Sequence, residues 1–566
     1  MAPDRGKMGG TAMKKTTVTA MDETAGTNAG RTADASQLAG ADHVTDAGRE
    51  TGAGRVADAG RVADAGRVAA GGERSGDRVP WTVWVIAAVF VGVELALSGR
   101  YGFLQDELYF IVAGHHLALG YVDQPPLAPL LTRVTAVLGV SPTAIRIAPA
   151  LAGGVVVVLT ARFAALFGAG RFGRMLAALA AACAPVVLAL AHLGITEPFD
   201  LLAWTVVLLC VCTALLRDRP RWWLGAGVAA GLGLEDNNLM ALLLIGLLAG
   251  LLLTRRRRIL RTPWPWLGAG LAALIWLPNV IWLATHQWSE LTMASSLHQD
   301  NNSVVAYISS LPVQLAFAGL FVIPLTIVGA VRLWRTPELR FLAVTVTVIV
   351  VFVVLWVPGK QYYGQGTGPA VLAAGCAAAE GWMARAAARG RRAGWRRGLL
   401  IAAPLLSIAL TGLTILPIVP VADLHNVAGL DQVTTADTVG WPQLVATVAA
   451  QDAALARAGD APTAIFTGNY GEAGALDVLG GSDHLPPVLS GHNTFWLWGP
   501  GSASDRTVLV VDALGALQPY FASCRVLTTW NAPDQVPSAY SGLDISLCTG
   551  PKASWPAIWP NLKHYD

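Results

Sequence analysis

The stretch Gln105–Leu127, QDELYFIVAGHHLALGYVDQPPL, holds the strongest pattern in this chain. It opens with two adjacent carboxylates, Asp106 and Glu107, shortly after the first strongly apolar segment, and it closes on Asp123 and the Pro125–Pro126 pair. Acidic side chains at a bilayer boundary cost free energy, so they indicate a functional site by default. An ordinary hydrated loop would also carry acids, but it does not account for the tyrosines and prolines that frame these.

The composition is that of a polytopic membrane protein. Of the 566 residues, 54% are hydrophobic and 14% are charged, and the mean hydropathy of +0.50 is too high for a soluble multidomain protein. The net charge of +3 is small, and nothing in the chain suggests a nucleic-acid partner.

Three regions follow from composition. Residues 1–78 nearly lack large apolar groups, which predicts a disordered cytoplasmic tail without the apolar core of a signal peptide. Residues 79–420 carry the apolar segments. Residues 421–566 have globular composition and predict an extracytoplasmic α/β domain, with strands at 464–467 and 507–511 and a helix at 443–458.

Apolar runs of near-spanning length predict about eleven transmembrane helices. They are 81–99, 148–168, 174–192, 200–216, 221–235, 238–254, 265–284, 310–331, 340–357, 366–384 and 398–418, and 126–140 is a candidate re-entrant or interfacial helix.

The distribution of charge predicts the orientation. Alternate connections are rich in Arg, most clearly at 255–261 and 385–397, whereas the opposite connections carry the acids. By the positive-inside rule the N-terminus is cytoplasmic, and an odd number of spans puts the C-terminal domain outside the cell membrane. Cys524 and Cys548 fall in that domain, where disulfides persist, and we expect them to be bridged; the other four cysteines lie in apolar segments as packing groups.

Acids and aromatic polar residues gather on the predicted outer side, which indicates a site that works there. Two carboxylates from different loops can divide the work of a general base, and Asp106 with Glu197 or Asp200 would suit. A phosphate leaving group needs cations, and the candidates are Lys360, Arg133, Arg146 and the His115–His116 pair. For Lys360, snorkelling to the interface beside Tyr362 and Tyr363 is an equal alternative.

Several motifs together make the chain resemble a known family. They are Asp106–Glu107 with Tyr121 to Leu127, Thr196 to Asp200 at the start of a helix, and Lys360-x-Tyr362-Tyr363 with Pro369. Over roughly residues 80–420 this combination is similar to the GT-C glycosyltransferases, within them to the dolichyl-phosphate-mannose protein mannosyltransferase and aminoarabinose transferase group. The stretches 468–476 and 485–500 resemble the outer domain of bacterial, actinobacterial-type members.

The resemblance implies an inverting transfer of a sugar, mannose or another hexose or pentose, from a polyprenyl-phosphate donor to a hydroxyl on the outer face. It implies Asp106 as the catalytic base, Glu107 in support, and Asp200 as the second acid, with Glu197 as the alternative. Lys360 would contact the donor phosphate. The remaining expected contacts are Tyr362, Tyr363 and Arg133 at the phosphate, and Tyr121, Asp123, Tyr470, His492 and Asn493 at the acceptor or sugar. For the C-terminal residues, an ordinary domain core is the alternative.

One segment departs from the family pattern. Many relatives carry a Lys three residues after Gly-Leu-Gly-Leu, but here Gly231–Leu234 is followed by Glu235, Asp236, Asn237 and Asn238. The expected cation is replaced by acids, which would suit a hard divalent ion bridging to phosphate. No metal site is predicted, and no cofactor is expected to be required.

Other functions remain open from sequence. A flippase or exporter of a lipid-linked glycan needs no catalytic base, and the scarcity of ionisable groups near mid-membrane weakens this alternative. A non-catalytic scaffold in cell-envelope synthesis is supported only by the altered Glu235–Asn238 segment. The acceptor, whether protein, polysaccharide or glycolipid, and the sugar are not determined by these patterns.

Overall fold

The computed structural model of the protein describes residues 78–290, 292, 304–356, 361–390, 394–427, 435–502 and 504–565. Residues 73–566 belong to one compact unit. The predicted tail lies outside the described residues except for Arg78, and so do Lys360 and the segment 293–303.

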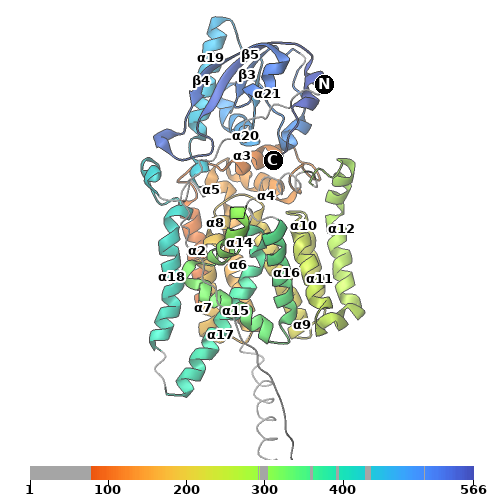
Figure 1. Cartoon of the computed structure of the whole chain (residues 1–566), viewed down its shortest axis with the longest axis vertical. Coiled ribbons are helices and arrows are strands. Elements are labelled where there is room, and N and C mark those ends of the chain that lie inside the picture. Colours follow the sequence, from red (N-terminus) through yellow and green to blue (C-terminus); the bar gives the residue numbers. More distant parts are fainter. Residues whose placement is uncertain are drawn as a thin grey trace, which may run out of the picture. The chain divides into compact units, whose positions relative to one another are not determined.

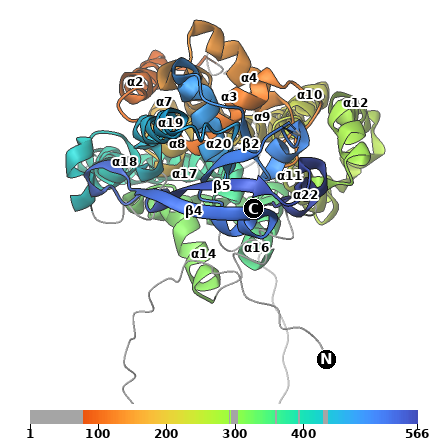
Figure 2. The same cartoon turned by 90° about the horizontal axis from the view of Figure 1, so that it is seen from above.

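The N-terminal part of the unit, up to Ile415, is mainly a set of apolar helices. Their bounds are α2 (Trp81–Leu97), α6 (Ile147–Leu166), α7 (Arg171–Ala182), α8 (Pro185–Ala191), α9 (Glu197–Leu216), α10 (Trp222–Leu234), α11 (Met240–Leu252), α12 (Pro263–Thr285), α14 (Val304–Ala316), α15 (Ile323–Arg335), α16 (Arg340–Trp356), α17 (Gly368–Ala388) and α18 (Gly394–Ile415). Helices α12 and α18 lie at opposite flanks of this set (Figures 1 and 2).

Each of the predicted apolar segments coincides with a helix or a bent helix pair. Among the described residues, 4 helices are long and apolar enough to cross a membrane, or up to 6 if each bent pair is one span. The predicted segment 174–192 bends by 57° between α7 and α8, where Pro185 begins the second helix, and 310–331 bends by 79° between α14 and α15. The predicted total of spans therefore stays a prediction.

Connections of like charge meet at the same ends of the helices. Arg332 donates to the carbonyl of Phe167 at 2.5 Å, and Arg256 donates to the carbonyls of Leu215 and Glu338 at 3.3 and 3.4 Å. These bonds join the end of α15 to the end of α6, and the Arg255–Arg261 connection to α9 and to the connection between α15 and α16. Which face of the membrane these connections occupy stays a prediction.

Short helices connect the apolar helices to the C-terminal domain. They are α3 (Gln105–His115), α4 (Leu127–Thr135), α5 (Pro142–Ile145) and the 3₁₀ helix η4 (Gln361–Thr367). In Figure 1, α3, α4 and α5 lie between the apolar helices and the C-terminal sheet. Glycine permits close contact there, because a Cβ on Gly474 would lie 3.0 Å from the carbonyl carbon of Leu108.

The C-terminal domain is built on a five-stranded sheet in the order β2-β1-β3-β5-β4. Its strands are β1 (Ala464–Thr467), β2 (Val488–Ser490), β3 (Thr507–Val511), β4 (Phe521–Trp530) and β5 (Leu543–Pro551). Strand β1 pairs in parallel with β2 and β3, and β5 pairs antiparallel with β3 and β4. The main helices are α19 (Trp441–Ala458) and α20 (Tyr470–Leu479), followed by the short α21 (Leu514–Leu517) and α22 (Trp555–Ile558).

Local sequence explains several of these elements. The apolar runs predicted as strands coincide with β1 and β3, and α19 begins two residues before the predicted helix. Helix α20 starts at a capping box, in which the Asn469 side chain accepts from the Gly471 amide at 2.6 Å and Glu472 accepts from the Asn469 amide at 3.3 Å.

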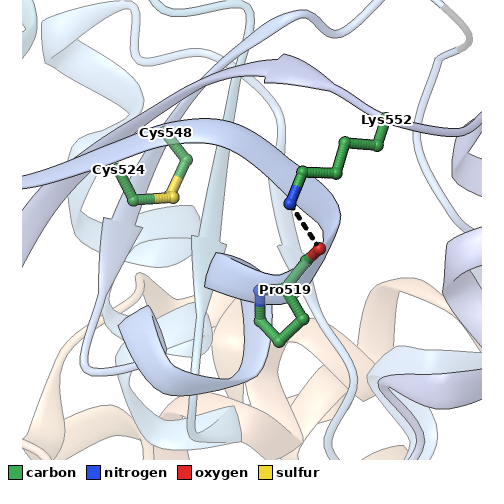
Figure 3. Close-up of a disulfide and its surroundings, with 4 residues drawn as sticks. All are labelled: Pro519, Cys524, Cys548 and Lys552. Atoms are coloured by element: carbon green, nitrogen blue, oxygen red, sulfur yellow. Dashed lines mark hydrogen bonds between the residues drawn. A yellow bond between two sulfur atoms is a disulfide. The ribbon is translucent and has the colours of Figure 1, made fainter.

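A disulfide joins the two cysteines that the sequence pairs. Cys524 on β4 and Cys548 on β5 are opposite each other in the strand register and are bonded. Nearby, Lys552 donates to the carbonyl of Pro519 at 2.9 Å (Figure 3). The other four cysteines are buried and free.

Candidate active site

Glu107 is fully bound inside the protein. It is 0% exposed, and its two carboxylate oxygens accept from Arg146 Nε and Nη2 at 2.8 and 2.7 Å. The amides of Leu104 and Gly194 add bonds of 2.8 and 2.7 Å. Through these contacts, Glu107 fixes the start of α3 to the segment that precedes α9.

Arg146 is also buried, and its hydrogen bonds are made within the protein. Besides binding Glu107, it donates to the carbonyls of Ser98 at 2.6 Å and Gly102 at 2.9 Å, and it is 1% exposed. The sequence suggested Arg146 as a cation for a leaving phosphate. The structure instead makes it the buried counter-ion of Glu107, because a bidentate guanidinium–carboxylate pair satisfies both groups.

Asp106 lies on the neighbouring position of α3 and is only partly buried. The hydroxyl of Tyr470, at the start of α20, donates to Asp106 Oδ1 at 2.6 Å. The sequence placed these two residues in separate regions of the chain. The structure brings them together, so the proposed base is held from the C-terminal domain.

Asp123 is held in the same way by two side chains. The hydroxyl of Tyr109 donates to its Oδ1 at 2.8 Å, and Asn493 Nδ2 donates to its Oδ2 at 3.1 Å. Burial raises the pKa of Asp123 to about 6; the hydrogen bond from Tyr109 acts against that rise, and the nearby Asp106 adds to it. The rings of Tyr109 and Tyr470 lie 5.0 Å apart, so the two acids are held by one aromatic pair.

The loop that ends in the Pro-Pro-Leu motif is folded on itself. The Tyr121 side chain is 0% exposed, and its hydroxyl donates to the carbonyl of Ala113 at 2.9 Å. The amide of Leu127 donates to the carbonyl of Glu235 at 2.8 Å. Tyr121 therefore shapes the loop, and a contact between Tyr121 and a sugar stays a prediction.

A second group of acids lies at the start of α9. Asp200 is 8% exposed and Asp236 is 1% exposed. Within the described residues, both carboxylate oxygens of Asp236 and Oδ1 of Asp200 lack a hydrogen-bond partner. Burial raises the pKa of Asp236 well above its usual range, and the nearby Asp200 and Glu197 raise it further. The segment that departs from the family pattern thus lies beside the predicted second acid.

Further acids of the same loops carry polar partners. Asn238 donates to Glu290, and Thr196 donates to Glu197 at 3.2 Å. Burial raises the pKa of Glu290 to about 7, with the Asn238 hydrogen bond acting against the rise and the nearby Asp123 adding to it. Glu290 was missed from sequence, although it is one of the acids on the predicted outer side.

The tyrosine pair of η4 faces these acids. Tyr362 and Tyr363 pack edge to face, with ring centroids 5.0 Å apart. Burial raises the pKa of Tyr362 well above its usual range, and the neighbouring Tyr363, Glu197 and Asp106 add to the rise. The starts of η4, α9 and α3 therefore converge. Lys360, directly before η4, lies outside the described residues.

The remaining candidate cations lie on α3 and α4. Arg133 is exposed on α4, which approaches α3 closely enough that a Cβ on Gly114 would lie 3.2 Å from the Arg133 Cβ. His115 and His116 are also exposed, and His116 stacks on Trp498 at 4.7 Å. Arg133 is exposed, and its contact with a donor phosphate stays a prediction.

The C-terminal residues that were predicted to contact a sugar are mostly interior. His492 and Asn493 are each 1% exposed. His492 Nδ1 accepts from the amide of Tyr470 at 3.2 Å, and its ring stacks on His564 at 4.7 Å. The indole of Trp496 donates to the carbonyl of Trp559 at 3.0 Å. These contacts match the alternative of a packed domain core, and sugar contacts by these residues stay predictions.

A buried acid inside an apolar helix was also missed. Glu94 of α2 is 1% exposed, and its Oε2 lies 2.9 Å from His192 Nδ1. A lone acid in the run Trp81–Leu97 was the available signal. The pair connects α2 to the segment between α8 and α9, whose Gly194 amide donates to Glu107.

An apolar groove lies between α9, α10, α11 and α12. Its volume is about 360 Å³. The walls include Val207, Ala226, Leu234, Leu247, Trp266 and Trp276. Helices α10 and α12 meet at glycines, since a Cβ on Gly227 would lie 2.2 Å from the carbonyl oxygen of Gly268. Leu234, the last residue of α10, lines the groove and directly precedes Glu235 of the second acid group.

No metal site is evident in the part of the chain that the structure describes. There, no group of three or more His, Cys, Asp or Glu side chains is arranged to hold an ion.

Comparison with known proteins agrees with the predicted resemblance. A family model for dolichyl-phosphate-mannose-protein mannosyltransferases matches residues 123–282. A search of curated sequences gave no match.

Two solved structures of ArnT from Cupriavidus metallidurans share the fold. The apo structure has a TM-score of 0.57 and the structure bound to undecaprenyl phosphate has 0.52, each at 16% identity over 82% of this chain and 97% of the other. The chain therefore has an ArnT-like fold, with apolar helices followed by a small C-terminal sheet, and the resemblance to the GT-C mannosyltransferase and aminoarabinose transferase group is confirmed.

Proposed function

We propose that the protein is an inverting membrane glycosyltransferase that transfers a sugar from a polyprenyl-phosphate donor to a hydroxyl acceptor on the outer face of the cell membrane. The observation that carries this proposal is the placing of Asp106. It is a partly buried carboxylate that a phenol holds at 2.6 Å, beside a second acid and the η4 tyrosines. An oriented carboxylate near a phosphate-binding segment is what a general-base displacement requires.

The proposed step assigns each group a task. Asp106 takes the proton of the acceptor hydroxyl as its oxygen attacks the anomeric carbon of the sugar. The bond from that carbon to the phosphate oxygen breaks, its electron pair leaves with the polyprenyl phosphate, and the configuration inverts. We assign Lys360, Tyr362, Tyr363 and Arg133 to the donor phosphate, because charge-assisted contacts stabilise such a leaving group.

Two further findings support a polyprenyl donor. The solved ArnT structure with the same fold holds undecaprenyl phosphate. In this chain, the apolar groove between α9 and α12 reaches Leu234, at the end of the helices where the acids gather. We propose that the isoprenoid chain occupies this groove, while the acids at its end face the sugar phosphate.

Sugar transfer in membranes tests the proposal directly. Membranes that contain the protein receive a panel of radiolabelled polyprenyl-phosphate sugars, and wild type is compared with Asp106→Asn. We expect one donor to label an acceptor, and we expect the variant to lose about 10²- to 10⁴-fold of the rate.

The matched control is Asp423→Asn, which neutralises an exposed acid on the 3₁₀ helix η5 (Val421–Asn426). It should transfer at the wild-type rate. Transfer that is indifferent to Asp106 at equal protein level would reject Asp106 as the base, and movement of lipid-linked sugar without any transfer would favour an exporter.

A further inference from the structure

The C-terminal domain contacts the proposed acids through its own side chains. Tyr470 donates to Asp106, and Asn493 donates to Asp123. The sequence separations of these pairs are 364 and 370 residues. A third bond, from the amide of Val122 to Thr494 Oγ1 at 2.9 Å, joins the same two segments.

Tyr470 is built to be a donor. Burial and the adjacent Asp106 raise the pKa of its hydroxyl well above the usual range, so the phenol keeps its proton. Its backbone is fixed at the start of α20, where its amide donates to His492 Nδ1 at 3.2 Å. The hydroxyl therefore has a fixed origin and direction.

Asn493 is held in an unusual backbone conformation. Its φ is +46°, in the left-handed region, and its side chain is 1% exposed. Such a conformation costs free energy for a residue with a side chain, although Asn tolerates it better than most. The conformation brings Nδ2 to Asp123.

We propose that Tyr470 and Asn493 are positioning residues of the transfer reaction, so that the C-terminal domain completes the active site by orienting Asp106 and Asp123. This inference rests on the proposed function. It differs from the expectation that these residues bind the sugar. A hydrogen bond from Tyr470 fixes one carboxylate oxygen of Asp106 and stabilises its charged form, which is the form that accepts the proton.

The separation of kcat from KM distinguishes positioning from sugar binding. In the transfer assay we expect Tyr470→Phe to lower kcat about tenfold and to leave the donor KM within about twofold of wild type. Because Phe removes the hydrogen-bond donor that stabilises the charged carboxylate, the acidic limb of the kcat profile should move to higher pH.

The matched controls lie elsewhere in the same domain. Tyr520→Phe removes a hydroxyl far along the chain from α20, and His484→Gly removes an exposed side chain at a φ of +51°. Both should leave kcat, KM and the pH profile unchanged. Asn493→Gly deletes the contact to Asp123 while accepting the positive φ, so we expect it to lower kcat without straining the backbone, and His484→Gly controls for the added backbone freedom.

Each kinetic result of these variants has a different meaning for the inference. A raised KM with unchanged kcat in Tyr470→Phe would overturn the inference in favour of sugar binding, and unchanged kinetics would reduce Tyr470 to a packing residue. If Tyr470→Phe does not accumulate, Asn493→Gly carries the same test, and an unchanged kcat there overturns the inference. The proposed function fails separately, when Asp106→Asn retains activity in the same assay.

Discussion

The two acidic regions at the ends of the helices are built differently. In the first, Glu107 is bound by Arg146 and two amides, and Asp123 by Tyr109 and Asn493. In the second, Asp236 is as buried as Glu107, yet its oxygens accept no hydrogen bond from any described residue. Hydrogen-bond donors act against the effect of burial on Asp123 in the first region, whereas no donor acts against it on Asp236 in the second.

This difference in hydrogen bonding indicates that the acids of the two regions have different roles. An acid held by several donors keeps its charge and its direction, which suits a base and its support. A buried acid without donors favours its neutral form, and a nearby cation shifts it towards the charged form. Substitutions that remove charge should therefore act in opposite directions at Glu107, which pairs with Arg146, and at Asp236.

The largest effect is expected at the buried pair. Glu107→Gln leaves Arg146 unpaired in the interior, which typically destabilises by about 3–5 kcal/mol. Thermal unfolding of the purified protein in detergent should show a much lower midpoint than wild type. Arg133→Gln, at an exposed position on α4, is the control and should unfold as wild type does. An unchanged midpoint in Glu107→Gln would contradict the role of Glu107 in fixing α3 through Arg146.

The opposite sign is expected in the second region. Asp236→Asn replaces a buried carboxylate that lacks hydrogen bonds by a neutral group of the same shape, so we expect a gain of about 1 kcal/mol in the free energy of unfolding. The same detergent unfolding assay measures it. A loss as large as that in Glu107→Gln would show that Asp236 has a strong partner, and the two regions would then be built alike.

A smaller effect is expected in the pH dependence. The pKa of Asp123 is raised by folding from 3.8 to about 6, so the folded state binds more protons than the unfolded state between these values. Stability from this group is therefore present at low pH and is lost as pH rises from about 4 to about 6. Asp123→Asn should flatten that part of the unfolding profile, and an equal slope in the variant would contradict the assignment.

The smallest effect is expected from chelation. Because no described group of side chains is arranged to hold an ion, we expect transfer to continue in excess EDTA at close to its initial rate. The control is the same membranes in EDTA with added Mg²⁺. A rate that falls in EDTA and returns with Mg²⁺ would point to an ion bridging the acids of the second region to the donor phosphate.

Much of the fold could be predicted because its signals are local. Apolar runs of near-spanning length coincide with helices or bent pairs, and β-branched runs such as Thr507–Val511 coincide with strands. The bends at Pro185 and between α14 and α15 were not predicted, because hydropathy averages over a window and does not register a change of direction.

The sequence predicted which residue types form the site, but it did not predict which partners they contact. Asp106 and Glu107 are adjacent in sequence and were expected to work together, but a helix sends neighbouring side chains in different directions. Glu107 therefore points to Arg146 inside the protein, while Asp106 points to Tyr470. The sequence of α3 alone does not show which of these two carboxylates points to a partner in the C-terminal domain.

The sequence by itself determined the membrane class of the protein, the positions of its helices and the motifs that mark its acids, because hydropathy and motif spacing are properties of short segments. Only the tertiary structure decided that the C-terminal domain holds those acids. Asp106 and Tyr470 are 364 residues apart, and they meet because the backbone of α20 packs directly on α3 at Gly474. Such contacts depend on how whole elements pack, which no local pattern encodes.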